Sequence, residues 1–97
     1  MKVQTVSRTM GKNEREVTAV GGIVEIDLHG KNEYQSRVAI DAALRRAGGG
    51  TYRIRVIHGY HGGTVLRDMV RREYKGRVLR METGIDPGIT DLVLREF

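Results

Sequence analysis

The chain has 97 residues, no cysteine and a formal net charge of +5 at pH 7. A chain of this length forms one domain with a modest core, and the lack of cysteine excludes disulfides and thiolate metal sites. No apolar run approaches the roughly 18 residues of a transmembrane helix. The N-terminus has no apolar signal-peptide core, so we expect a cytoplasmic protein without a membrane partner.

Arginine carries most of the positive charge, because only four of the 17 basic residues are lysines. Its guanidinium binds phosphates bidentately and stacks on bases, which favours nucleic acid as the partner. The alternative is a basic surface that binds no nucleic acid, as in many basic proteins.

Residues 1–21 are interpreted as a partly flexible N-terminal extension, although 3–6 and 17–20 could pair as short strands. Residues 23–29 and 51–58 alternate apolar and polar side chains, which is typical of half-buried strands. The sequence therefore predicts two strands, separated by a segment long enough for a helix.

The segment between these strands has the signals of a helix. Asn32 and Gln35 fit a capping box, and the glycines at 48–50 end the helical pattern. Its apolar stripe is expected at Tyr34, Val38, Ile40, Ala42, Ala43, Leu44 and Ala47. A strand–helix–strand unit implies that the two strands are parallel.

The second half predicts one helix and two more strands. The apolar positions of the helix are Val65, Leu66, Met69, Val70 and Tyr74. Residues 77–82 and 90–97 are expected to be antiparallel strands, since the turn between them is short. The predicted fold class is α/β: a two-layer βαβαββ domain over residues 22–97, with two helices on one face of a four-stranded mixed sheet. Arg53 and Arg55 are expected on the open face.

Three side chains with acid–base chemistry are expected at one edge of this sheet. Asp27 and His29 lie at the end of the first strand, and His58 lies at the end of the second. Parallel strands end at the same edge, where open α/β sheets bind ligands. A glycine loop then leads into a helix N-terminus, which suits a phosphate. The candidate nucleic-acid contacts are Gly59, Tyr60, His61, Gly62, Gly63, Arg53, Arg55, Arg67 and Arg71.

Three stretches resemble the Smr (small MutS-related) domain family. "VEIDLHG" (24–30) is similar to the family's Leu-Asp-x-His motif, and "HGYHGG" (58–63) to its His-Gly-x-Gly motif. The ending "DPGITDLVL" (86–94) resembles its Gly-rich turn and last strand. The resemblance covers about residues 22–97.

The resemblance implies a fold like the C-terminal domain of translation initiation factor three. It also implies nucleic-acid binding and, in many members, endonuclease activity on branched or nicked DNA or on ribosome-associated RNA. It assigns the family's functional positions to Asp27, His29, His58 and Gly59.

We therefore predict an endonuclease that cleaves DNA or RNA with Asp27, His29 and His58. One imidazole would deprotonate the attacking oxygen, another would protonate the leaving oxygen, and Asp27 would orient His29. Arg67 and the loop N–H groups would stabilise the charge on the phosphorane.

Two other functions stay open at this point. The same loop, with Tyr60 stacking on a base, could bind nucleic acid without cleaving it. A metal-dependent hydrolase with Asp27, His29, His58 and His61 as ligands is less favoured, because no ligand spacing matches a known zinc pattern, and we expect no resident cofactor. Structural roles also stay open. Asp27 could cap a turn, and His58 could be a core residue, because alternation along its strand directs its side chain into the helix layer.

Overall fold

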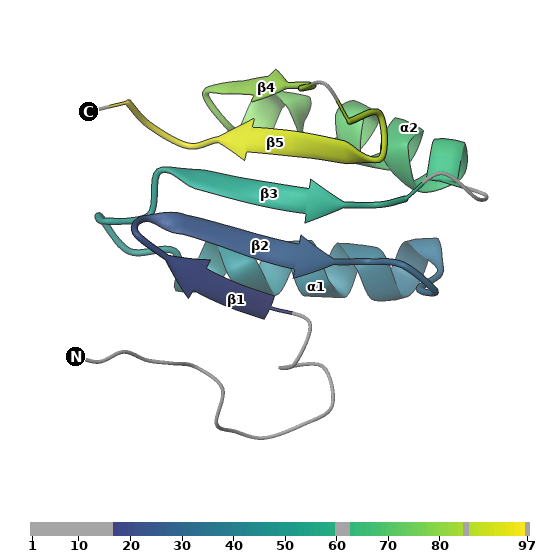
Figure 1. The fold of residues 1–97 in the computed structure, drawn as a ribbon, viewed down its shortest axis with the longest axis horizontal. Coiled ribbons are helices and arrows are strands. Elements are labelled where there is room, and N and C mark those ends of the chain that lie inside the picture. Colours follow the sequence, from purple (N-terminus) through teal and green to yellow (C-terminus); the bar gives the residue numbers. More distant parts are fainter. Residues whose placement is uncertain (1–16, 60–62, 85, 97) are drawn as a thin grey trace.

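The computed structural model of the chain describes residues 17–59, 63–84 and 86–96. These residues form one mixed sheet covered by two helices (Figure 1). In chain order the elements are β1 (Val17–Val20), β2 (Ile23–Asp27), α1 (Glu33–Arg46), β3 (Arg53–Ile57), α2 (Gly63–Tyr74), the 3-10 helix η2 (Lys75–Arg77), β4 (Arg80–Glu82) and β5 (Ile89–Val93).

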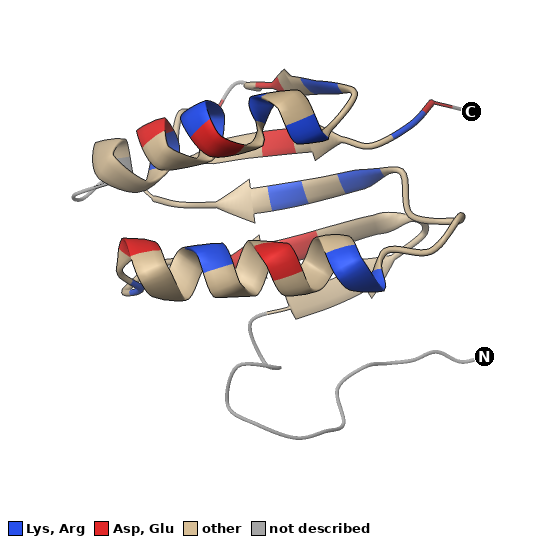
Figure 2. Cartoon of the chain, turned by 180° about the vertical axis from the view of Figure 1, so that it is seen from behind, with Lys and Arg blue, Asp and Glu red and all other residues tan. Residues whose placement is uncertain are grey.

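The sheet has the strand order β1-β2-β3-β5-β4. Strands β2 and β3 are parallel, as the strand–helix–strand pattern predicts, and β5 is antiparallel to both β3 and β4. Both helices lie on the same face of the sheet and begin at the edge where β2 and β3 end (Figures 1 and 2). The α/β class and the two-layer arrangement are therefore observed.

The expectation of four strands is wrong, because β1 adds a fifth. It pairs antiparallel with β2, from Val17 opposite Ile26 to Val20 opposite Ile23. The hairpin turns at Gly21 and Gly22, whose φ angles are +59° and +87°. A two-residue turn with both residues at positive φ matches the twist of the strands and favours glycine. The sheet thus begins within the segment that the sequence indicated as an extension.

The predicted helix start is confirmed in detail. The Asn32 side chain accepts a hydrogen bond from the Gln35 backbone N–H at 2.8 Å, and the Gln35 side chain accepts from the Asn32 N–H at 3.0 Å. The apolar stripe is wrong in part, since Tyr34 is 70% exposed and Val38 is also exposed. Ile40 and Ala43, which the same stripe included, do pack in or against the core, next to the buried Ser36.

The later strands are shorter than expected. Residues 77–79 do not extend β4, because Arg77 ends η2 and lies over the Tyr74 ring, with its Cζ 4.8 Å from the ring centroid. Strand β5 ends at Val93, before the C-terminal residues that the alternation included. The core lies between the helices and the sheet and contains Ile26, Leu28, Ile40, Ile54, Val56, Leu66, Met69, Val70, Tyr74 and Leu92.

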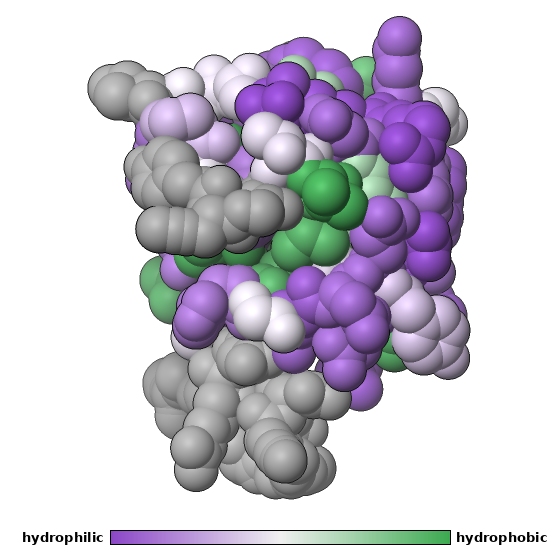
Figure 3. Space-filling model, turned by 90° about the vertical axis from the view of Figure 1, so that its right-hand side faces the viewer, coloured by the Kyte–Doolittle hydropathy of each residue, from purple (hydrophilic) through white to green (hydrophobic). Residues whose placement is uncertain are grey.

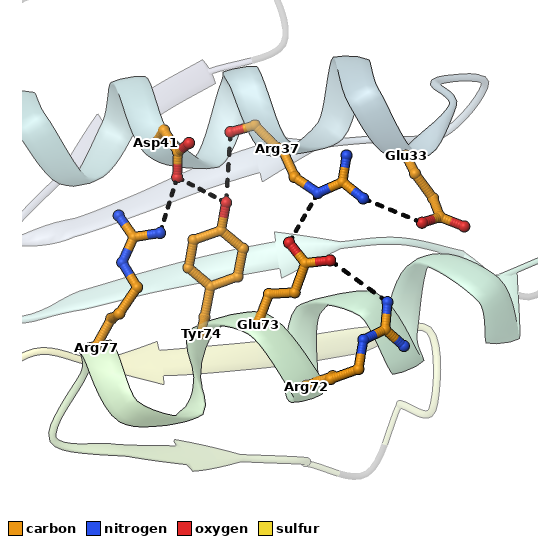
Figure 4. A network of polar contacts seen from close by, with 7 residues as sticks. All are labelled: Glu33, Arg37, Asp41, Arg72, Glu73, Tyr74 and Arg77. Atoms are coloured by element: carbon orange, nitrogen blue, oxygen red, sulfur yellow. Dashed lines mark hydrogen bonds and ion pairs between the residues drawn. The ribbon is translucent and has the colours of Figure 1, made fainter.

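Polar contacts join the two helices above this core (Figure 4). The Arg37 Nε donates to the Glu73 carboxylate at 2.7 Å, and the Tyr74 hydroxyl donates to Asp41 at 2.7 Å. Arg77 donates to the same Asp41 oxygen at 3.2 Å. Burial, followed by the hydrogen bond to Asp41, raises the pKa of Tyr74, so its hydroxyl stays protonated. These contacts join α1 to α2, and both helices begin at the same end of the domain (Figure 1).

Candidate functional site

Three segments meet at the edge where β2 and β3 end. Asp27 is paired in register with Ile57, so the two strands end side by side. The turn before β5 closes on the same edge, because the backbone N–H groups of His58 and Gly59 both donate to the Gly88 carbonyl, at 2.9 and 3.0 Å. Figure 3 views the domain from this end and shows apolar side chains in the middle, with hydrophilic ones around them.

Asp27 and His29 form an exposed carboxylate–imidazole pair. The Asp27 Oδ1 accepts the backbone N–H of His29 at 3.0 Å and lies 3.7 Å from the His29 Nδ1. The backbone bond holds the carboxylate in place at the strand end. The His29 side chain is 82% exposed. Gly30 follows with φ +84°, which turns the chain towards α1 and leaves the imidazole open to solvent.

His58 has a different environment, because it is only 3% exposed. Its Nδ1 lies 3.2 Å from the Gly59 carbonyl and its Nε2 lies 2.9 Å from the Thr90 hydroxyl. A carbonyl can only accept, so Nδ1 carries the proton and the neutral Nε2 accepts from Thr90. Burial lowers the pKa of His58, and the positive charges of Arg71 and Arg67 lower it further, against the hydrogen bond to Gly59.

The structure does not bring His58 together with the Asp27–His29 pair. Asp27 and its register partner Ile57 point to the open face, and the next residue, His58, points into the helix layer. Among the described residues, no hydrogen bond or ion pair joins His58 to Asp27 or His29. The ends of β2 and β3 therefore meet at one edge of the sheet, as predicted, but the imidazoles of His29 and His58 lie on opposite sides of the sheet.

Part of the predicted glycine loop lies outside the described residues, namely Tyr60, His61 and Gly62. Gly59 has φ +80°, and Gly63 is the first residue of α2. The phosphate-cradle interpretation of this loop stays a prediction.

Arg53 and Arg55 point to the open face, as expected, but both are paired with acids. Arg53 donates to Asp91 at 2.6 Å and to Glu82 at 3.0 Å. Arg55 donates to both Asp91 oxygens, at 3.1 and 3.2 Å. Hydrogen bonds to Asp91 raise the pKa of both arginines. Their charges are thus already satisfied within the sheet.

The other two candidate arginines lie on α2. Arg67 contacts Asp68 at 3.2 Å, next to it in the helix. Arg71 is exposed and has no ion pair with any described residue. Both are close enough to His58 for their charges to lower its pKa. These two arginines of α2 therefore place positive charge near His58.

Two residues at this end were not among the sequence-based candidates. Thr90 on β5 forms a hydrogen bond with His58, and its signal in the sequence was a polar residue at a core-facing position of the strand. Tyr34, taken from the sequence as a core residue, presents an exposed ring in the first turn of α1. Helical periodicity alone could not show which stripe faces the sheet.

Among the described residues, no group of three or more His, Cys, Asp or Glu side chains could hold a metal ion. Within the same part of the chain, no helix is both long and apolar enough to cross a membrane. A scan of protein-family models and searches of curated proteins and of solved structures found no match to this chain.

Proposed function

We propose that this chain is an Smr-like nucleic-acid-binding domain that acts as an endonuclease at the edge where β2 and β3 end. The observation that carries the proposal is the exposed pair of Asp27 and His29, with Oδ1 and Nδ1 3.7 Å apart. A carboxylate beside an accessible imidazole is a common acid–base unit, because the carboxylate orients the ring and stabilises its protonated form.

In the proposed reaction, His29 exchanges protons through Nε2, since Nδ1 faces Asp27. Nε2 takes the proton from the attacking oxygen, which belongs to water or to a ribose 2′-hydroxyl. The attacking oxygen forms a bond to phosphorus, the P–O bond to the leaving oxygen breaks, and the leaving oxygen gains a proton from the imidazolium or from solvent. Such general acid–base help contributes roughly 10²–10⁴-fold. Arg67 and the first N–H groups of α2 lie at the same edge and would stabilise the charge on the phosphorane.

His58 is proposed as a positioning residue. Its ring is buried and bonded at both nitrogens, and its lowered pKa keeps it neutral at pH 7. In that state it links Gly59, at the start of the loop from β3 to α2, to Thr90 of β5. Direct proton transfer by His58 would require its bond to Thr90 to break.

Tyr34 is proposed as a stacking surface for a base. Its ring is 70% exposed and lies in the first turn of α1, at the end of the domain that carries His29. Stacking of a base on an aromatic side chain is worth about 1–3 kcal/mol and does not depend on sequence.

The experiment that tests the proposal is cleavage of labelled single-stranded RNA and of branched DNA, with and without excess chelator. Wild type is compared with Asp27→Asn, His29→Ala and Tyr34→Ala, and binding is measured in parallel. The proposal expects Asp27→Asn and His29→Ala to bind but not cleave. Tyr34→Ala should bind more weakly and cleave at an unchanged rate when saturated.

Each contrary outcome has a distinct meaning. Binding by every protein without cleavage by any supports the alternative, a non-catalytic nucleic-acid-binding module, which the burial of His58 favours. Cleavage that stops in chelator supports a metal-dependent hydrolase. Cleavage that survives His29→Ala removes the proposed acid–base pair.

A further inference from the structure

The two faces of the domain differ in charge. The segments α1, α2 and η2 together carry eight Lys or Arg and four Asp or Glu, a net charge of +4. The five strands carry three arginines and four acids, a net charge of −1. The helix layer, seen from outside in Figure 2, is therefore the side that attracts a polyanion.

Each acidic residue of the helix layer forms an ion pair with an arginine. Glu33 and Glu73 pair with Arg37, at 3.3 and 2.7 Å. Asp41 pairs with Arg77 at 3.2 Å, and Asp68 with Arg67 at 3.2 Å. The exposed cations left without an ion pair among the described helix residues are Arg45, Arg46, Arg71 and Lys75.

Arg67 and Arg71 on α2, together with Lys75 at the start of η2, form a stripe along one side of this helical segment. They are four residues apart, which places them on neighbouring turns about 6 Å apart in rise, over about 12 Å in all. The first member is near enough to the site edge to affect the pKa of His58 by its charge. Because α2 begins at that edge and runs away from it, the stripe leads from the candidate site towards the opposite end (Figure 1).

The open sheet face offers no comparable surface. Asp91 binds Arg53 and Arg55 together and is only 12% exposed, so neither arginine is available to a phosphate unless this cluster opens. Glu82 also forms ion pairs with Arg53 and Arg80.

We infer that the sugar–phosphate backbone of single-stranded nucleic acid lies along Arg67, Arg71 and Lys75 and reaches the Asp27–His29 edge at the Arg67 end. One row of cations matches one row of phosphates, and the exposed Tyr34 suits an unpaired base. The sheet face with Arg53 and Arg55 stays free of nucleic acid. This inference rests on the proposed function and adds the path of the strand to it.

The test is a salt series of binding to a fluorescein-labelled single-stranded DNA of about 12 nucleotides, read by fluorescence anisotropy in the full chain. A gel confirms that the probe stays intact. The variant is the double substitution Arg71→Gln with Lys75→Gln. The matched control is Arg45→Gln with Arg46→Gln, which removes the same charge from exposed, unpaired positions at the end of α1. Thermal melting by circular dichroism checks that both variants fold.

Each single-strand phosphate contact contributes about 0.7 to the slope of log K against log salt. Loss of two contacts should therefore reduce the slope by about 1.4 and weaken binding about 25-fold at ~0.1 M salt. The Arg45/Arg46 control should stay within about twofold of wild type.

Two results would overturn the inference while leaving the proposed function standing. One is wild-type binding with an unchanged slope in the Arg71/Lys75 variant. The other is an equal loss in both variants, which would mean diffuse attraction to the whole layer. If wild type binds neither this probe nor RNA, the proposed function itself fails and the inference falls with it.

Discussion

The hydrogen bond between His58 and Thr90 gives a sharp stability prediction. In Thr90→Val the shape is nearly kept, but the buried Nε2 of His58 loses its donor. An unsatisfied buried acceptor costs about 1–3 kcal/mol. The new methyl group returns up to about 0.8 kcal/mol through apolar burial. We expect the free energy of unfolding to fall by about 1–2 kcal/mol, which lowers Tm by roughly 4–16 °C in a domain of this size.

The assay is urea unfolding followed by circular dichroism, because the chain has no tryptophan. The matched control is Thr18→Val, at an exposed position of the edge strand β1, which should change stability by less than about 0.5 kcal/mol. A double-mutant cycle with His58→Phe adds a second readout. With both partners apolar, the double variant should recover part of the stability lost in Thr90→Val. Equal stability of Thr90→Val and Thr18→Val, with no coupling to His58, would refute the reasoning.

Three further predictions concern the described residues. First, because burial lowers the pKa of His58, the unfolded state takes up its proton more readily. Its contribution to stability is thus present above the unfolded pKa of about 6.5 and is lost as pH falls through the lower folded pKa. Unfolding curves between pH 7.5 and 5 should show a shallower fall in His58→Phe than in wild type. Second, Asp91→Asn should cost about 1–3 kcal/mol in urea unfolding, since two arginines lose their shared acid, and a neutral result would mean that solvent replaces it. Third, Ser36 has a fully buried hydroxyl that finds no hydrogen-bond partner among the described residues. Ser36→Ala should therefore raise the free energy of unfolding by about 1 kcal/mol in urea unfolding, and a lower value would mean that the hydroxyl has a partner.

The sequence predicted those secondary-structure elements that depend on interactions between residues close together in the chain. The Asn32–Gln35 capping box and the alternation around β2 and β3 depend on neighbouring residues, and both are observed. Strand β1 was weighed only as a possible short strand, because its four residues carry a weak pattern. The stronger signal was the Gly21–Gly22 pair, which sets a two-residue hairpin turn.

The features of the candidate site that could not be predicted depend on how strands that are distant in the sequence pair with one another. Parallel pairing was enough to place Asp27 and His58 at one edge, and strand parity indicated that His58 could be buried. The pairing of Arg53 and Arg55 with Asp91 depends on how β5 lies against β3, which no local pattern specifies. An arginine-rich sequence therefore overstated the basic character of the sheet face.

The most direct test of where this protein meets nucleic acid is an NMR titration of the ¹⁵N-labelled full chain with a single-stranded oligonucleotide. We expect amide shifts at residues 27–31, at 58–59 and along α2, with Arg53, Arg55 and Arg80 unchanged. Shifts centred on those three arginines, with the β2–β3 edge unperturbed, would contradict the proposed site.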